Sequence, residues 1–234
     1  MFRKVNRFEI ERFKKNTSTK DYMIRTQEWW NHFWANGNNN YGSPNQKLLQ
    51  CAEEFIRDRK LSAVDIASGN GRYAIELAKM GYGVDAIEYA DSGVERIRVA
   101  AGLANVNVNV LQGDFTELCL NQNYYDLVFC SGLLEEIGKK DHEKVILGFM
   151  NWTKPGGINL IKYCLEIRGR GQLVDEGFVK SFYDRAGWKI LFFEEQDELH
   201  ISKAVTLFTD GVDSEIRTGT VIAIKPEISS KYSR

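Results

Sequence analysis

A glycine-rich turn and two acidic residues in the first half of the chain have the types and spacing of a ligand site. Asp65 precedes the turn Gly69-Asn70-Gly71, and Glu88 follows that turn by about 20 residues. Glycines in such a turn allow a ligand to approach the main chain closely. A carboxylate at the position of Glu88 can accept hydrogen bonds from both hydroxyls of a ribose. The spacing therefore indicates a ligand that contains a nucleoside.

The turn alone does not decide which nucleoside ligand is bound. Gly69-x-Gly71-x-x-Ala74 fits the dinucleotide fingerprint, so a nucleotide-dependent oxidoreductase is one alternative. Asp65 favours a ligand with a cationic amino-acid end, because a carboxylate repels a pyrophosphate. A protein that binds the cofactor without catalysis is a second alternative.

A further acidic residue follows the next predicted strand. The segment Gln112-Gly113-Asp114-Phe115 ends that strand. The Asp114 carboxylate can accept a hydrogen bond from an adenine amino group, and the Phe115 ring can pack on the base. This segment supports an adenine nucleoside.

Strands and helices alternate from residue 46 onward, as in a doubly wound parallel α/β sheet. The pattern predicts helices at 46–59, 71–80, 92–102, 116–120, 140–152 and 176–186. It predicts strands at 61–66, 83–88, 106–112, 125–130, 157–164, 188–195 and 218–224. No helix is predicted between the last two strands, and Asp210-Gly211 is a turn signal, so we expect this pair to be antiparallel.

Five motifs in this order resemble the class I S-adenosylmethionine-dependent methyltransferases. They are Val64-Asp-Ile-Ala-Ser-Gly-Asn-Gly71, Val84-Asp-Ala-Ile-Glu88, Gly113-Asp-Phe115, Tyr125 to Ile137, and Lys154-Pro-Gly-Gly157. The resemblance implies a Rossmann-like methyltransferase fold with seven strands in the order 3-2-1-4-5-7-6 and strand 7 antiparallel. It also implies S-adenosylmethionine as cofactor and S-adenosylhomocysteine as product.

The resemblance also implies roles for individual residues. The methionine part of the cofactor is expected to contact Asp65 and the main chain of Ala67, Ser68 and Gly69, beside Gly71 of the same turn. The family pattern has glycine at the position of Ala67. An alanine is tolerated there if its φ angle is negative.

The nucleoside half and the methyl-donor end have their own expected contacts. The resemblance implies ribose binding by Glu88, adenine contacts from Tyr89, Asp114 and Phe115, and a methyl-donor end facing Ser131 and Gly132.

Two further segments resemble the tellurite-resistance and thiopurine-type small-molecule methyltransferases. After the strand at 188–195, Glu198-Leu199-His200 matches the first group, but Ile201 replaces an arginine that would hold an oxyanion. In the second group a lid carries aromatic residues, matched here by Trp30, Trp34 and Tyr41. Such a lid can face a sulfonium and exclude water. We therefore expect a helical, aromatic lid segment at 1–45, a methyltransferase domain at 46–226 and a tail at 227–234.

Methyl transfer from a sulfonium is an in-line displacement in which positioning supplies much of the rate. The acceptor is expected to be a small molecule with a soft sulfur, selenium or tellurium nucleophile, or a nitrogen or oxygen nucleophile. An acceptor that loses a proton needs a general base, for which His200 is the first candidate and His32 the second. His142, the third histidine, is expected at the surface.

The composition is that of an ordinary globular protein with 31 basic and 32 acidic side chains and a net charge of −1. The near balance argues against nucleic acid as a partner. We identify no signal peptide and no apolar run of about 20 residues, so we expect a cytoplasmic protein without membrane partners. Its four cysteines show no metal-site spacing, and no metal is expected. The oligomeric state does not follow from the sequence.

Overall fold

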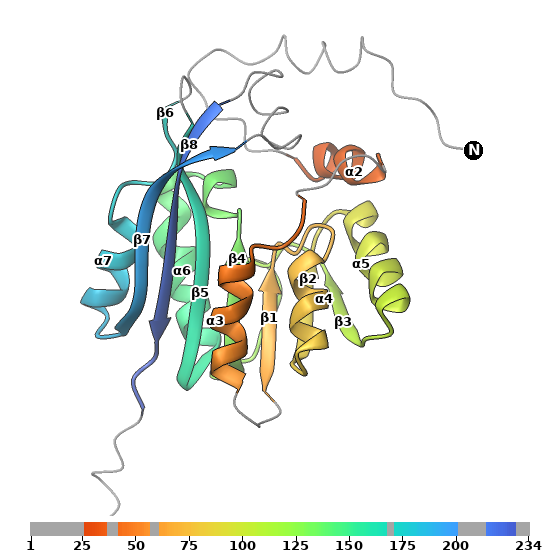
Figure 1. The fold of residues 1–234 in the computed structure, drawn as a ribbon, viewed down its shortest axis with the longest axis horizontal. Coiled ribbons are helices and arrows are strands. Elements are labelled where there is room, and N and C mark those ends of the chain that lie inside the picture. The colour runs from red at the N-terminus through yellow and green to blue at the C-terminus, as the bar shows by residue number, and fades with distance from the viewer. Residues whose placement is uncertain (1–25, 37–41, 57–60, 168–170, 201–213, 228–234) are drawn as a thin grey trace, which may run out of the picture.

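The computed structural model describes residues 26–36, 42–56, 61–167, 171–200 and 214–227 (Figure 1). Among these residues, no helix combines the length and apolar character needed to cross a bilayer. Several sequence expectations lie outside the described residues: most of the expected lid segment at 1–45 with Tyr41, and further along the chain Ile201 and the turn at Asp210-Gly211.

The centre of the fold is a mixed sheet in the strand order β3-β2-β1-β4-β5-β8-β7. Its strands are β1 (Ser62–Ile66), β2 (Gly83–Glu88), β3 (Val108–Gln112), β4 (Tyr125–Ser131), β5 (Thr153–Ile167), β7 (Lys189–His200) and β8 (Ser214–Ile224). Strands β1 to β5 are parallel, and β8 is antiparallel to both neighbours. This confirms the expected order and the antiparallel end. One short strand, β6 (Gly171–Gln172), pairs with β5 and was not predicted.

Helices cover both faces of the sheet (Figure 1). They are α2 (Gln27–Ala35), α3 (Gln46–Ile56), α4 (Arg72–Lys79), α5 (Asp91–Ala104), α6 (His142–Trp152) and α7 (Phe178–Arg185), with 3-10 turns η1 (Leu134–Glu136) and η2 (Lys139–Asp141). Alternate residues of each strand point to opposite faces. Ala63 thus joins the core under α3 and α4, whereas Val64 joins the core under α6 and α7.

The predicted helix at 116–120 is wrong, because this segment is a hydrogen-bonded turn. The Asp114 Oδ1 atom accepts hydrogen bonds from the Thr116 main-chain nitrogen at 2.8 Å and from the Thr116 hydroxyl at 2.7 Å. The Asp114 carbonyl accepts from the main-chain nitrogens of Glu117 and Leu118. An aspartate side chain that bonds the nearby backbone favours a turn over a continuing helix.

Strands β5, β7 and β8 are longer than predicted, and they extend beyond the ends of the other strands. β4 ends at Ser131, which pairs with Lys162, while β5 continues to Ile167. β7 and β8 accompany this extension, since Ile167 pairs with Ile216 and Gln196 with Thr218. In Figure 1 these strands project on one side of the carboxyl edge, and α2 lies on the other side above α5. The carboxyl ends of β1 and β4 lie between them.

The turn between β1 and α4 takes a left-handed backbone at three positions. The φ angle is +56° at Ala67, +59° at Gly69 and +76° at Gly71. A Cβ atom at Gly69 would lie 2.6 Å from the Cζ2 atom of Trp34, and one at Gly71 would lie 2.8 Å from the Cγ1 atom of Ile97. Both glycines are therefore required by packing as well as by φ. The negative φ that would make an alanine acceptable at position 67 is not found.

Replacing Ala67 with glycine is expected to stabilise the protein. The left-handed conformation of alanine costs the folded state about 1–2 kcal/mol. Glycine removes this cost, but its greater conformational entropy in the unfolded chain lowers the stability by about 0.4–1 kcal/mol. The free energy of unfolding should rise by roughly 0.5–1 kcal/mol, and the melting temperature by about 2–4 °C per kcal/mol. Thermal and denaturant unfolding measure both. In the control variant Ala100→Gly, which changes an interior residue of α5, the free energy of unfolding should instead fall by about 1 kcal/mol. Equal losses in the two variants would contradict the strain at Ala67.

Candidate functional site

Asp65 is buried at the end of β1, with 2% of its surface exposed. Its Oδ2 atom accepts a hydrogen bond from the Ala74 main-chain nitrogen at 3.1 Å, in the first turn of α4. Its carbonyl oxygen accepts one from the Ser68 hydroxyl at 2.7 Å. Burial raises the pKa of Asp65 to about 7, against the opposing effect of these hydrogen bonds. The carboxyl thus fixes the helix start beneath the turn.

Glu88 is buried at the end of β2, with 4% of its surface exposed. Its Oε2 atom accepts a hydrogen bond from the Gly69 main-chain nitrogen at 2.7 Å, and its Oε1 atom accepts one from the Ala90 nitrogen at 2.9 Å. Helix α5 approaches closely because Gly93 has no side chain: a Cβ atom there would lie 2.8 Å from Glu88 Cγ. Burial raises the pKa of Glu88 to about 7. One carboxyl therefore joins the glycine turn to the start of α5.

The residues expected around an adenine lie at the neighbouring strand ends. Tyr89 follows β2 and packs beside the aromatic residues of α2. Asp114 is exposed after β3, and Phe115 is half-buried against the core. The Gly113 nitrogen donates to the Glu88 carbonyl at 3.1 Å, which holds this turn beside β2. The fold thus places these residues on the β2–β3 side of Gly69.

The expected methyl-donor end lies on the other side of the turn. Ser131 is the last residue of β4, and Gly132 is exposed with a φ angle of +87°. The Gly132 nitrogen donates to the Lys162 carbonyl at 3.0 Å. The end of β4 is therefore fixed against β5, where the longer strands begin to project.

Helix α2 places an aromatic cluster directly on the glycine turn. Trp34 is 3% exposed, and its ring occupies the space in which a Gly69 side chain would lie. Trp30 stacks on Trp34 with ring centroids 5.9 Å apart and an interplanar angle of 21°. The Arg96 guanidinium lies 5.5 Å from the centre of the Trp34 ring. Trp30 and Trp34, the two described residues of the expected lid, therefore belong to one packed aromatic group over the glycine turn.

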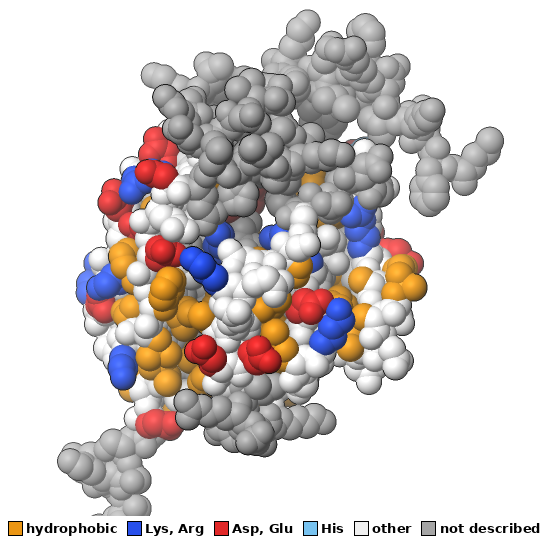
Figure 2. All heavy atoms as spheres, viewed as in Figure 1, with side chains coloured by type: hydrophobic (Ala, Val, Ile, Leu, Met, Phe, Trp, Pro, Cys, Tyr) orange, Lys and Arg blue, Asp and Glu red, His pale blue; other side chains and the backbone are white. Residues whose placement is uncertain are grey.

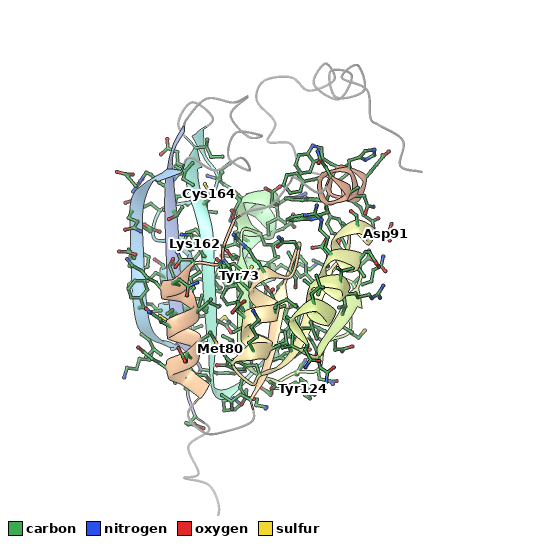
Figure 3. The ribbon with its side chains drawn as sticks, turned by 45° about the vertical axis from the view of Figure 1, so that its right-hand side comes forward. Tyr73, Met80, Asp91, Tyr124, Lys162 and Cys164 are labelled. Atoms are coloured by element: carbon green, nitrogen blue, oxygen red, sulfur yellow. The ribbon has the colours of Figure 1, made fainter. Side chains whose placement is uncertain are left out.

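Polar contacts hold α2 on the first turns of α5. The Asn31 Oδ1 atom accepts from the Ser92 nitrogen at 3.1 Å, and the Asn31 carbonyl accepts from the Ser92 hydroxyl at 2.7 Å. The Asn31 amide also donates to Asp91 at 3.4 Å; Figure 3 labels Asp91 at the start of α5, below α2. The Arg96 side chain donates to the Asn36 carbonyl at 2.7 Å. Sequence reasoning missed these contacts, because no local pattern joins residues about 60 positions apart.

The three histidines lie on three different elements. His32 is exposed on α2, and its Nδ1 atom is 2.8 Å from the Glu28 carbonyl of the same helix. His200 ends β7 opposite Ser214, within the strand instead of after it. Its side chain lies outside the described residues. His142 is buried, contrary to expectation, with Nε2 2.9 Å from the Leu134 carbonyl. The structure therefore does not bring a histidine together with the glycine turn among its described side chains.

Charged side chains of both signs are mixed on the face shown in Figure 2. No extended patch of a single charge is seen there, as the balanced composition leads one to expect.

Similarity to known proteins covers this same part of the chain. Residues 63–157 match a family described as a methyltransferase domain. The ubiquinone biosynthesis O-methyltransferase of Rickettsia prowazekii (strain Madrid E) is 28% identical over 165 residues, covering 67% of this chain and 59% of that relative. The chain thus spans about three fifths of the relative's length.

Two solved structures share the fold. TehB from Haemophilus influenzae has a TM-score of 0.65 at 16% identity, over 84% of this chain and 67% of that chain. Phosphoethanolamine N-methyltransferase 2 of Haemonchus contortus was solved with phosphomonomethylethanolamine and S-adenosylhomocysteine. Its TM-score is 0.62 at 18% identity, over 91% of this chain and 61% of that chain.

The matched segment contains the glycine turn, Glu88 and Asp114 in the expected order. The sheet has the strand order and the antiparallel end that the motifs imply. Residues 63–157 therefore match a methyltransferase domain, on the fold expected of the class I S-adenosylmethionine-dependent methyltransferases.

Proposed function

We propose that the protein binds S-adenosylmethionine at the carboxyl ends of β1, β2 and β4 and transfers its methyl group to a small-molecule acceptor. The observation that carries this proposal is the buried Glu88 carboxyl on the Gly69 main-chain nitrogen, at 2.7 Å. This contact supports a ribose-binding role for the carboxyl beside the glycine turn. The crystal structure of the Haemonchus contortus relative with S-adenosylhomocysteine supports the cofactor assignment.

The same carboxyls argue against the oxidoreductase alternative. A dinucleotide loop offers its main-chain N–H groups and a helix N-terminus to a pyrophosphate. Here Glu88 accepts from the Gly69 nitrogen, and Asp65 accepts from the Ala74 nitrogen in the first turn of α4. Two carboxyls therefore face the donors that a pyrophosphate would need. This arrangement favours a ligand with a cationic part over a dianionic one.

Each part of the site has a proposed task. S-adenosylmethionine supplies an activated methyl group on a sulfonium. Glu88 exchanges its contact with Gly69 for the ribose hydroxyls, Asp114 and Phe115 hold the adenine, and Trp34 closes the site from above. Ser131 and Gly132 orient the donor end toward the acceptor. Positioning of donor and acceptor then supplies much of the rate.

The acceptor is proposed to react through oxygen or nitrogen. The names of the relatives describe one O-methyltransferase and one N-methyltransferase. The alternative, a soft sulfur, selenium or tellurium acceptor, is supported by the resemblance of the aromatic lid. His200 is the proposed general base for an acceptor that loses a proton. The exposed position of His32 makes it the weaker candidate.

Calorimetric titration tests the cofactor assignment directly. Both S-adenosylmethionine and S-adenosylhomocysteine should bind with one site per chain, and NAD should give no saturable heat. Methyl transfer to a panel of phenols and amines then distinguishes an enzyme from a protein that only binds the cofactor. Binding of NAD without S-adenosylhomocysteine would support the oxidoreductase instead.

Glu88→Gln should weaken S-adenosylhomocysteine binding by about 10- to 100-fold. The amide can accept from one hydroxyl but loses the charge that strengthens two hydrogen bonds, each worth about 1.5–3 kcal/mol when charge-assisted. The exposed Glu95→Gln on α5 is the matched control and should bind normally. Equal affinity of the two variants would show that Glu88 does not hold the ribose.

Cofactor affinity should also depend on pH through Glu88. Because the pKa of the free Glu88 carboxyl is about 7, roughly half of it is protonated at pH 7. Binding requires the carboxylate, so affinity should fall below pH 7, and binding at pH 7 should release about half a proton. Calorimetry in buffers of different ionisation enthalpy measures this release. The Asp65 carboxyl, whose pKa is also about 7, can release a proton as well, so the test is the difference between the variant and the native protein. Proton uptake, or a release that is undiminished in Glu88→Gln, would contradict the assignment.

Trp34→Ala tests the lid. Removal of the ring that covers Gly69 should speed dissociation of S-adenosylhomocysteine about tenfold, since a buried aromatic contact contributes roughly 1–2 kcal/mol. Stopped-flow displacement measures the rate. Trp29→Ala removes a ring of the same cluster that stacks on Phe33, and it should change the rate less. A larger effect of Trp29→Ala would place the lid contact elsewhere on α2.

A further inference from the structure

A half-buried lysine interrupts the apolar face of β5 that lies under α3. Ile158 and Leu160 point to this face and are 1% and 0% exposed. Lys162 is the next residue on the same face, because alternate strand residues share a side. It is of intermediate exposure. A lysine is seldom placed in line with such a core stripe, since burying its charge is costly.

Hydroxyl side chains flank Lys162 on both neighbouring strands. Lys162 pairs with Ser131 of β4 and with Thr220 of β8. Residues directly opposite in a sheet point to the same face, so the three side chains form one row across the sheet, the Lys162 row. Thr220 is 8% exposed. The row continues to Glu194 on β7, two strands away from Lys162.

The Lys162 row lies at the proposed methyl-donor end. The Lys162 carbonyl accepts the Gly132 nitrogen at 3.0 Å, and Ser131 belongs to both the row and that end of the site. Figure 3 shows Lys162 on β5, below Cys164 on the projecting part of the strand and near the level of Tyr73. The row contains two charged residues, Lys162 and Glu194, and Lys162 is the one on the strand next to Ser131.

We propose that Lys162, with the hydroxyls of Ser131 and Thr220, binds an anionic oxygen group of the methyl acceptor, a carboxylate or a phosphate. A lysine in one row with two hydroxyl side chains offers the donors that such a group requires. The inference rests on the proposed methyl transfer, because it takes Ser131 to lie beside the donor. It makes Lys162 a residue that selects the substrate.

The test uses the complex with S-adenosylhomocysteine and small probes of known charge. Benzoate and inorganic phosphate represent the two sources of the anion, and benzamide is the neutral match for benzoate. Calorimetry of the complex should show at least one anion binding ten times more tightly than benzamide. Lys162→Met should lower the affinity for that anion by about 10- to 100-fold, and Lys162→Arg should retain most of this affinity. Lys154→Met, at the opposite end of β5, is the control and should bind the anion normally.

The outcomes separate the two proposals. Failure of the native protein to bind S-adenosylhomocysteine contradicts the methyltransferase function. Normal cofactor binding with no preference for either anion over benzamide overturns the role of Lys162. An anion that Lys162→Met binds as tightly as the native protein overturns it also. Should Lys162→Met fail to fold, Thr220→Val provides the same test, with an expected loss of about three- to tenfold in anion affinity.

Discussion

The hydrogen bond from the Gly69 main-chain nitrogen to the buried Glu88 carboxyl links the parts of the site. It joins the turn after β1 to the strand end of β2, and the second oxygen of the same carboxyl holds the start of α5. Helix α2 packs on both of these segments through Trp34 and Asn31. This carboxyl therefore connects the glycine turn with the start of α5, and α2 packs on both. The need to bury it also explains the glycine at position 93.

The proposed cofactor contacts and the proposed acceptor contacts lie on different parts of the sheet. The parallel strands β1, β2 and β3 end at one level and provide main-chain donors and carboxyls. Strands β5, β8 and β7 continue past Ser131 and form a wall whose first row carries Lys162 and Thr220. In the proposed site, variation of the wall would change the acceptor contacts without disturbing Glu88 or Asp65.

Much of this arrangement could be predicted from the sequence. Apolar patterns predicted the positions of most strands and helices, because buried parallel strands and their helices leave strong local patterns, whereas the strand order followed from the family resemblance. Asp65, Glu88 and Asp114 were predicted as site residues because strand ends in a parallel sheet meet at one edge, and they lie at or just after the ends of β1, β2 and β3. The left-handed Ala67 was not foreseen, since alanine carries no signal of positive φ. The buried His142 and the docking of α2 depend on contacts between distant residues, which local patterns do not contain.

A crystal structure with S-adenosylhomocysteine bound would test the central claim most directly. Both Glu88 oxygens are expected at about 3 Å from the ribose hydroxyls, with Trp34 against the cofactor and the sulfur facing Ser131 and Gly132. A ribose that lay elsewhere, while Glu88 still accepted from the Gly69 nitrogen, would contradict the role proposed for Glu88.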